Sequence, residues 1–268
     1  MAASPLDLSG SEKPAQIQAN LMAYMRLFAG LPGMVMRDGD VFWFVSHTPA
    51  PGNNILRTRW PPEDSEARID ELFAQIGQHL DEIGWMVFPG DQPADLGQRL
   101  ETRGMPGGPG GHWLWADLTA LGAGPTMPDT FHIEQVRDDQ ALAEWVWVSE
   151  AGFEAPLGCF YDAYARHGYG PDAGSLHYIG YLGDQPVTSG TLLDAGGAAT
   201  LYDISTPPEF RRQGLGSALT HALLRDIRRR GYADTWIWSS DIAVSVYQQL
   251  GFVKADFGVR EHTWHKRA

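Results

Sequence analysis

Apolar residues recur at steps of three and four in several stretches of the chain, and short apolar runs separate these stretches. In the first half this spacing predicts amphipathic helices over 14–29 and 64–83. Two apolar runs, 34–36 and 41–45, flank an Asp-Gly pair, which is typical of a β-hairpin. The other elements expected in this half are strands over 54–59, 85–88 and 112–118 and a helix over 93–103.

The second half predicts a similar order of elements. The expected strands cover 130–136, 176–182, 187–193, 198–206 and 236–238, and the expected helices cover 138–153, 160–166, 217–230 and a segment that Ser240 caps. Gly84 and Gly104 are 20 positions apart, and so are Gly231 and Gly251, with a strand and then a helix in each interval. An internal duplication at an offset of 147 residues explains this agreement, although any two α/β segments can share such spacing.

The stretch 202–217 joins a strand to a helix through two prolines and a basic turn that is rich in glycine. The first turn of a helix carries unpaired N–H groups and a partial positive charge, and glycine lets a phosphate approach the backbone. This order of elements predicts an anion-binding site.

Two motifs in this region occur in a fixed order. Arg211-x-x-Gly214-x-Gly216 matches the Arg/Gln-x-x-Gly-x-Gly/Ala pattern of the GNAT superfamily of acetyl-CoA-dependent N-acetyltransferases. The downstream run from Ser240 through Tyr247 to Phe252 is similar to a second motif of that family, with Ser240 in the place of the usual asparagine. The chain resembles this family by specific motifs over 130–259 and by pattern alone in the first half.

The resemblance implies an α/β fold with two tandem GNAT-like domains, each a mostly antiparallel mixed sheet that is flanked by helices and splayed between two central strands. It implies acetyl-CoA as the cofactor, with the pantetheine arm along residues 204–206 and the diphosphate on the glycine-rich loop. The residues that it implies in coenzyme A binding are Ile204, Ser205, Thr206, Arg211, Arg212, Gln213, Gly214, Leu215, Gly216, Ser217, Ser240 and Tyr247.

Two residues are candidates for proton transfer. Tyr247 matches the tyrosine with which the family protonates the coenzyme A sulfur, and its alternative role is to cap the core. Asp203 is the only carboxylate on its strand, and by alternation it shares a face with Leu201 and Ser205. Asp203 therefore either accepts the proton of the amine or braces the sheet.

The first half differs from the family pattern at its site. The offset aligns loop 211–216 with 64–69, which two prolines and Glu63 precede. The prolines lack N–H groups, and Glu63, Asp64 and Glu66 would repel a diphosphate. Leu100 stands in the place of Tyr247. We expect a degenerate domain that completes a substrate cleft or a dimer face. The expected boundaries are a flexible tail over 1–13, the degenerate domain over 14–121, a linker over 122–128 and the acetyltransferase domain over 129–268.

Composition narrows the function classes. An apolar content of 43% is typical of a globular protein, and the net charge of −13 argues against nucleic-acid binding. Cys159 is the single cysteine and cannot form an internal disulfide, so a reducing cytoplasm is expected. Residues 1–13 lack the basic start and the apolar core of a signal peptide, so none is expected. No stretch approaches the ~18 apolar residues of a membrane span, and no cysteine or histidine motif predicts a metal.

We therefore predict an N-acetyltransferase that transfers an acetyl group from acetyl-CoA to a primary amine, on a small molecule or a peptide, by direct attack in a ternary complex. The alternatives are a non-catalytic acyl-CoA-binding sensor or regulatory module, and a thiol-precursor synthase that resembles mycothiol synthase. A homodimer is compatible with each of these functions.

Overall fold

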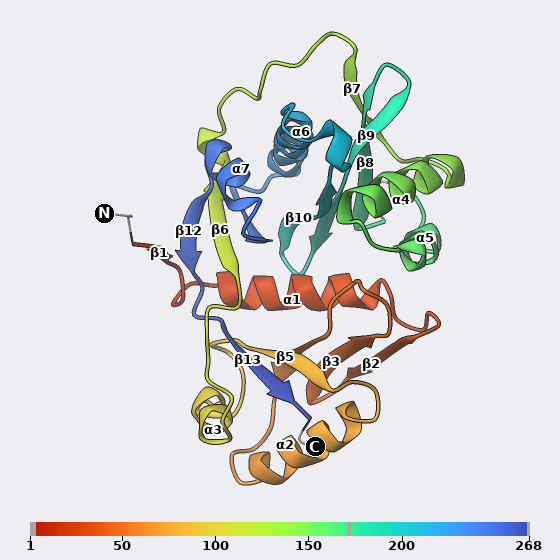
Figure 1. Ribbon diagram of the computed structural model, residues 1–268. Helices are drawn as coiled ribbons and strands as arrows, with labels where there is room; N and C mark the ends of the chain where they lie inside the picture. Colours follow the sequence, from red (N-terminus) through yellow and green to blue (C-terminus); the bar gives the residue numbers. More distant parts are fainter. Residues whose placement is uncertain (1–3, 171–172, 267–268) are drawn as a thin grey trace. The chain divides into compact units, whose positions relative to one another are not determined.

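A computed structural model describes residues 4–170 and 173–266 of the chain (Figure 1). The chain forms two compact units. The first unit comprises Leu6–Gly111 and Asp256–Ala268, and the second comprises Met1–Pro5 and His112–Ala255. Each unit therefore takes its residues from two separate stretches of sequence.

The first unit is a mixed sheet with a helix on each face. Its strands have the order β13-β5-β4-β3-β2, in which only β4 and β5 are parallel. Trp43 and Val45 face α2, whereas Phe44 contacts Phe28 beyond the other face, because neighbouring strand residues point to opposite sides. The elements are β1 (Leu6–Asp7), α1 (Lys13–Arg26), β2 (Met34–Asp38), β3 (Val41–Ser46), β4 (Asn54–Thr58), α2 (Ser65–Ile76), β5 (Glu82–Val87), α3 (Leu96–Thr102) and β13 (Arg260–His265).

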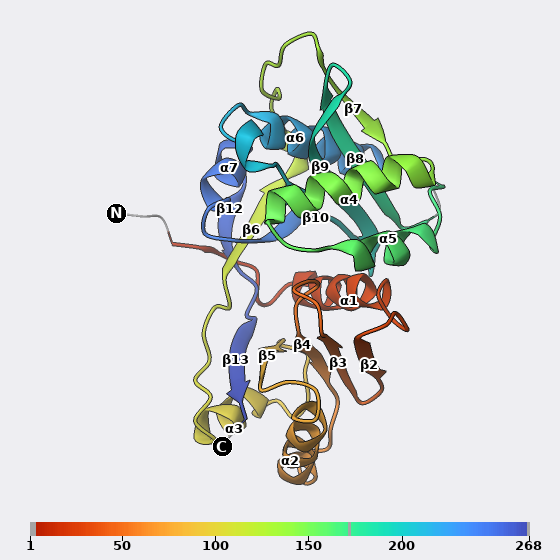
Figure 2. The same ribbon diagram turned by 45° about the vertical axis from the view of Figure 1, so that its right-hand side comes forward.

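The second unit has two sheets. One is antiparallel with the order β10-β9-β8-β7, and in the other β6 lies between β11 and β12. Helices α4 and α6 cover opposite faces of the larger sheet, as Figure 2 shows. The elements are β6 (His112–Asp117), η1 (Leu118–Ala120), β7 (Phe131–Gln135), α4 (Asp139–Phe153), α5 (Gly158–Ala165), β8 (Ser175–Leu182), β9 (Gln185–Ala195), β10 (Ala198–Ser205), η2 (Pro208–Phe210), α6 (Leu215–Arg229), β11 (Asp234–Ser239), α7 (Val244–Gln249) and β12 (Val253–Asp256).

The predicted elements are confirmed in type and order, with corrections to one helix, to the predicted tail and to the predicted linker. Helix α2 ends at Ile76, so the prediction of a helix to 83 is wrong, and Ile83 lies in β5. The predicted tail already contains β1, and the Leu8 N–H donates to Asp256 O at 2.8 Å. The segment predicted as a linker, 122–128, belongs to the second unit, where Gly122 O accepts a hydrogen bond from His221 on α6.

Two strands lie in the unit opposite to the one expected. Strand β6 pairs with β11 of the second unit over six residues, with Trp113 opposite Trp238 and Trp115 opposite Trp236. Strand β13 pairs with β5 of the first unit, where Trp264 stacks on Phe73. The predicted boundaries at 121 and 129 therefore do not separate the units. A hydrophobic pattern indicates that a segment is a strand, but it does not name the strand's partner.

Candidate coenzyme A site

The loop between β10 and α6 exposes a series of backbone N–H groups. In the described part of the chain, no protein acceptor takes the N–H groups of residues 212–217, whereas the Arg211 N–H donates to Pro208 O at 3.2 Å. Arg212 and Gly214 have φ angles of 67° and 79°, which turn the chain before α6 begins at Leu215. These N–H groups and the positive end of a 15-residue helix suit a diphosphate.

Glycine is required in this loop for two different reasons. Gly214 has the left-handed conformation that side chains disfavour. A Cβ atom on Gly216 would lie 3.1 Å from Thr206 Oγ1, so the loop packs closely against the end of β10. The residues present therefore fit the diphosphate of coenzyme A.

Arg211 fastens the loop to the rest of the unit. Its Nε donates to Thr206 O at 3.0 Å, its Nη2 donates to Gly152 O at 2.8 Å, and it pairs with Glu154 at 3.3 Å. The resemblance implies Arg211 in coenzyme A binding, and in the structure its guanidinium donates hydrogen bonds to protein carbonyls. Arg211 and Arg212 are both exposed.

Two side-chain hydrogen bonds link strands β10 and β11 near their first residues. Thr235 Oγ1 donates to Ala199 O at 2.8 Å, and Thr200 Oγ1 donates to Trp236 O, but the two strands belong to different sheets. Strand β10 is the end strand of its sheet, and the loop follows its last residues. The family resemblance implies that the pantetheine arm lies along this edge.

The carboxyl end of β10 is irregular. Its register against β9 shifts between Tyr202 and Ser205, and Asp203 has a φ of 54°. Thr188 Oγ1 donates to Ser205 O at 2.7 Å, so one of the carbonyl groups expected to pair with the arm already has a protein partner. A bulge of this kind re-aims side chains at sheet edges.

Asp203 faces a different side from the one predicted. Leu201 packs with Leu219 and Leu223 of α6, whereas the Asp203 carboxylate accepts a hydrogen bond of 2.6 Å from the Tyr164 hydroxyl of α5. The expectation that Asp203 and Leu201 share a face is wrong, because the bulge breaks the alternation of the strand. Sequence reasoning did not find Tyr164, since no motif surrounds it.

Tyr247 lies in α7, inside the core of the second unit. Its ring packs edge-on to Phe252 with 5.6 Å between ring centroids, and the residue is only 6% exposed. Burial raises the pKa of Tyr247 above its usual value near 10, so the phenol carries its proton at neutral pH. This state suits a proton donor and is equally expected of a core residue.

Ser240 does not cap α7. The helix begins at Val244 with Ala243 as its N-cap, and Ser240 O accepts the Ala243 N–H in a preceding turn. The predicted N-cap is therefore wrong, because an extra turn separates β11 from the helix. Ser240 itself is exposed beyond the end of β11.

In the first unit, the protein's own chain occupies the corresponding edge. The Gln92 N–H donates to Thr58 O at 2.9 Å, and the Trp60 N–H donates to Gln92 O at 3.2 Å. The Asp91 carboxylate accepts the N–H groups of Thr58 and Phe88. Burial raises the pKa of Asp91 to about 6. The backbone groups after β4 therefore already have partners within the protein, in agreement with a degenerate site.

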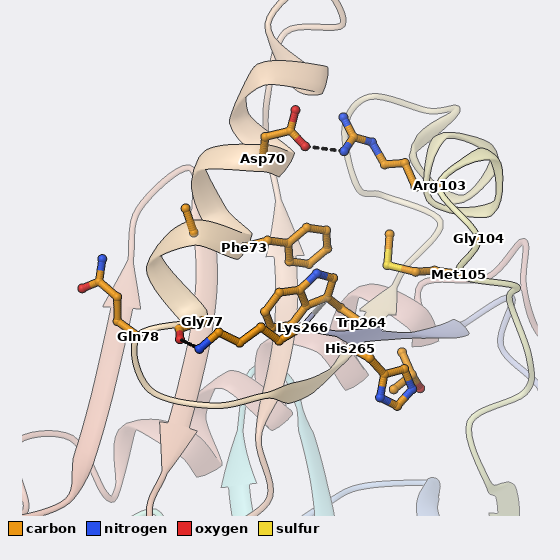
Figure 3. A pocket seen from close by; sticks show the side chains of 12 residues that line it. Asp70, Phe73, Gly77, Gln78, Arg103, Gly104, Met105, Trp264, His265 and Lys266 are labelled. Carbon is orange, nitrogen blue, oxygen red and sulfur yellow. Dashed lines mark hydrogen bonds and ion pairs between the residues drawn. The ribbon is translucent and has the colours of Figure 1, made fainter. Parts of the chain in front are cut away.

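The first unit also contains a hollow of about 720 Å³ between α2, the segment after α3 and β13 (Figure 3). Phe73 and Trp264 stack in it with 4.9 Å between ring centroids. Its charged side chains have partners within the protein: Arg103 pairs with Asp70, and Lys266 donates to Gly77 O at 2.7 Å.

The described residues lack the features of two other kinds of site. None of the described helices is both long and apolar enough to cross a bilayer. The described part of the chain also holds no group of three or more His, Cys, Asp or Glu side chains arranged to bind a metal.

Comparisons with known proteins agree with this geometry. Residues 189–264 match the family model described as FR47-like protein. Over 60 residues, or 21% of the chain, the sequence is 40% identical to the ribosomal protein bS18-alanine N-acetyltransferase of Escherichia coli K12, and the match covers 40% of that enzyme. A second match, to an uncharacterized N-acetyltransferase of Porphyra purpurea, has 31% identity and covers 28% of this chain and 42% of the relative. The chain thus spans about two fifths of the length of these curated relatives.

Two solved structures resemble nearly the whole chain. A GCN5-related N-acetyltransferase from Kribbella flavida has a TM-score of 0.61 at 15% identity, with 93% of this chain and 96% of that chain covered. A tandem GNAT protein from the clavulanic acid biosynthesis pathway has a TM-score of 0.62 at 14% identity, with 97% and 96% covered. The fold is therefore that of two GNAT-like domains, and the resemblance to the GNAT superfamily is confirmed.

Proposed function

We propose that the second unit transfers an acetyl group from acetyl-CoA to a primary amine. The observation that carries this proposal is the run of N–H groups over 212–217, which have no acceptor in the described part of the chain and lie between β10 and the first turn of α6. The family match over 189–264 includes this loop and α7.

The residues divide into those that bind and those that move protons. The N–H groups of 212–217 hold the diphosphate, Arg212 adds positive charge, and residues 204–206 lie along the pantetheine arm. When bound, acetyl-CoA supplies a thioester carbon that an amine can attack. Tyr247 is placed in the role of the acid that protonates the departing sulfur, which its protonated state at neutral pH supports.

The amine must lose a proton before or during its attack. A lysine-like amine has a pKa of ~10.4, so it is an ammonium ion near neutral pH and needs a base. Asp203 is the carboxylate on the strand that runs beside the expected arm. The net charge of −13 favours a cationic acceptor. The Escherichia coli relative acts on an alanine of a ribosomal protein, so a peptide amino terminus belongs among the acceptors to be tested.

Two measurements on the full chain test the proposal. Calorimetry should detect binding of acetyl-CoA, and a thiol assay should detect coenzyme A release with at least one member of an amine panel. The panel contains spermidine, an aminoglycoside, free amino acids and a peptide with amino-terminal alanine. Binding without thiol release from any member would favour the acyl-CoA-binding sensor, and no binding at all would refute a coenzyme A site.

A matched pair of charge reversals locates the binding site. Arg212→Glu and Arg228→Glu change the net charge equally, but Arg228 lies about 20 Å away along α6, at ~1.5 Å per residue. We expect Arg212→Glu to weaken acetyl-CoA binding about tenfold or more and Arg228→Glu to leave it nearly unchanged. If both substitutions weaken acetyl-CoA binding equally, the effect comes from the net charge of the protein and not from a binding site at the loop.

A further inference from the structure

The hydrogen bond between Tyr164 and Asp203 joins α5 to the irregular end of β10. The phenol oxygen lies 2.6 Å from Asp203 Oδ2. Asp203 has the left-handed backbone conformation, which aspartate adopts more readily than most residues. The bulge thus turns the carboxylate toward the α5 side of the sheet, away from the core beneath α6.

The surroundings of Tyr164 fix the direction of its hydroxyl. The side chain is fully buried, its ring stacks on His177 with 3.9 Å between centroids, and Trp145 meets it edge-on at 5.3 Å. His177 Nδ1 lies 2.9 Å from Thr191 Oγ1, which holds the imidazole ring in place. Burial lowers the pKa of His177 to about 3, so the ring behind Tyr164 is uncharged at neutral pH. Packing therefore holds the phenol ring in position, with its oxygen within hydrogen-bond distance of Asp203.

Two neighbouring phenols interact with Asp203. Tyr164 of α5 donates a hydrogen bond to its carboxylate, and burial, together with the Asp203 charge, raises the pKa of Tyr202 on β10 well above its usual value near 10. A hydroxyl that donates to a carboxylate stabilises the charged form of that carboxylate. Tyr164 therefore keeps Asp203 available both to attract an ammonium ion and to accept its proton.

We propose that Tyr164 is a positioning residue that holds the Asp203 carboxylate for the acceptor amine. This inference rests on the proposed acetyl transfer. In the step, an N–H bond of the ammonium ion breaks, an O–H bond forms on Asp203, and the electron pair stays on the nitrogen, which can then attack. Tyr164 keeps its own proton throughout.

The test compares Tyr164→Phe with Tyr169→Phe in the full chain. Tyr169 is a matched control, because it also donates a 2.6 Å hydrogen bond to an aspartate. Its partner is Asp139 at the start of α4, which has no part in the proposed step. For the panel amine that releases coenzyme A fastest, we expect Tyr164→Phe to move the acidic limb of the kcat/KM profile upward by about one to two pH units. Calorimetry should show unchanged acetyl-CoA affinity, and Tyr169→Phe should leave the limb where it is.

A second variant keeps the test decisive if Tyr164→Phe folds poorly. Asp203→Asn can still accept the Tyr164 hydrogen bond but cannot take a proton near neutral pH, so we expect a loss of kcat of about 10²-fold or more with acetyl-CoA binding retained. An unmoved acidic limb in Tyr164→Phe, or full activity in Asp203→Asn, overturns the inference while wild-type turnover still supports acetyl transfer. Absence of thiol release from the wild type with every panel amine overturns both proposals.

Discussion

Gly214 offers the sharpest test of the loop, because a glycine in a similar conformation lies at the other end of the same helix. Gly214 precedes α6 with a φ of 79°, and Gly231 follows it with a φ of 95°. A Cβ atom on Gly214 would come no closer than 3.8 Å to Met127 Sδ, and one on Gly231 would meet no atom within 4 Å. An alanine at either position therefore causes backbone strain without a steric clash.

The two substitutions should cost similar stability but differ in their effect on binding. The left-handed conformation costs an alanine about 1–2 kcal/mol, so urea unfolding should show losses of this size for both Gly214→Ala and Gly231→Ala. In Gly214→Ala the exposed loop can relieve the strain by rotating its peptides, which turns N–H groups away from the diphosphate. Each hydrogen bond to a charged group contributes about 1.5–3 kcal/mol, so losing one weakens acetyl-CoA binding about 10- to 100-fold.

Calorimetry with acetyl-CoA measures this difference directly. We expect the dissociation constant to rise in Gly214→Ala and to stay within about twofold of the wild type in Gly231→Ala. If Gly214→Ala loses stability but binds acetyl-CoA as tightly as the wild type, the loop N–H groups do not hold the diphosphate. Equal loss of affinity in both variants would mean that the stability of α6, and not the loop, controls binding.

Two further predictions concern Tyr247 and Asp91. Tyr247→Phe should bind acetyl-CoA normally but lose about 10²-fold in kcat, since phenylalanine cannot donate a proton; an unchanged kcat would leave Tyr247 only its role in the core. Because burial raises the pKa of Asp91 from 3.8 to about 6, its contribution to stability is fully present below pH 3.8 and is lost as the pH rises through 6, by about 3 kcal/mol. The difference in unfolding free energy between the wild type and Asp91→Asn should therefore shrink from pH 4 to pH 8, and a constant difference would contradict the assigned cause.

Local patterns in the sequence predict the elements of this protein well. The apolar spacing of α6, the glycines around it and the strand before it predict the loop between β10 and α6, because each of these features acts through neighbouring residues. The same reasoning extends α2 too far and gives α7 a cap at Ser240. Both errors concern short turns in which tertiary packing decides where a helix begins or ends.

Features that depend on distant contacts could not be predicted in the same way. The bulge that turns Asp203 toward Tyr164 joins residues 39 positions apart, and no alternation rule anticipates it. Gly152 is a similar case, since a Cβ atom there would lie 2.1 Å from Ser205 Oγ. A lone glycine near the end of a predicted helix is typical of a cap, and its contact with β10 becomes visible only in three dimensions.

Strand β6 comes from the first half of the sequence but pairs in the second unit, and β13 comes from the second half but pairs in the first unit. The two halves therefore cannot be separated by a single cut in the sequence. A fragment that starts at residue 129 lacks β6, which leaves the hydrogen-bonding edges of β11 and β12 bare, and it carries β13 without β5 beside it. Unpaired strand edges promote aggregation, so truncation within the glycine- and proline-rich segment 122–128 should yield insoluble protein. The composition of that segment is nevertheless typical of a domain boundary. Co-expressed fragments divided there should instead reassemble, because each supplies the strand that the other needs.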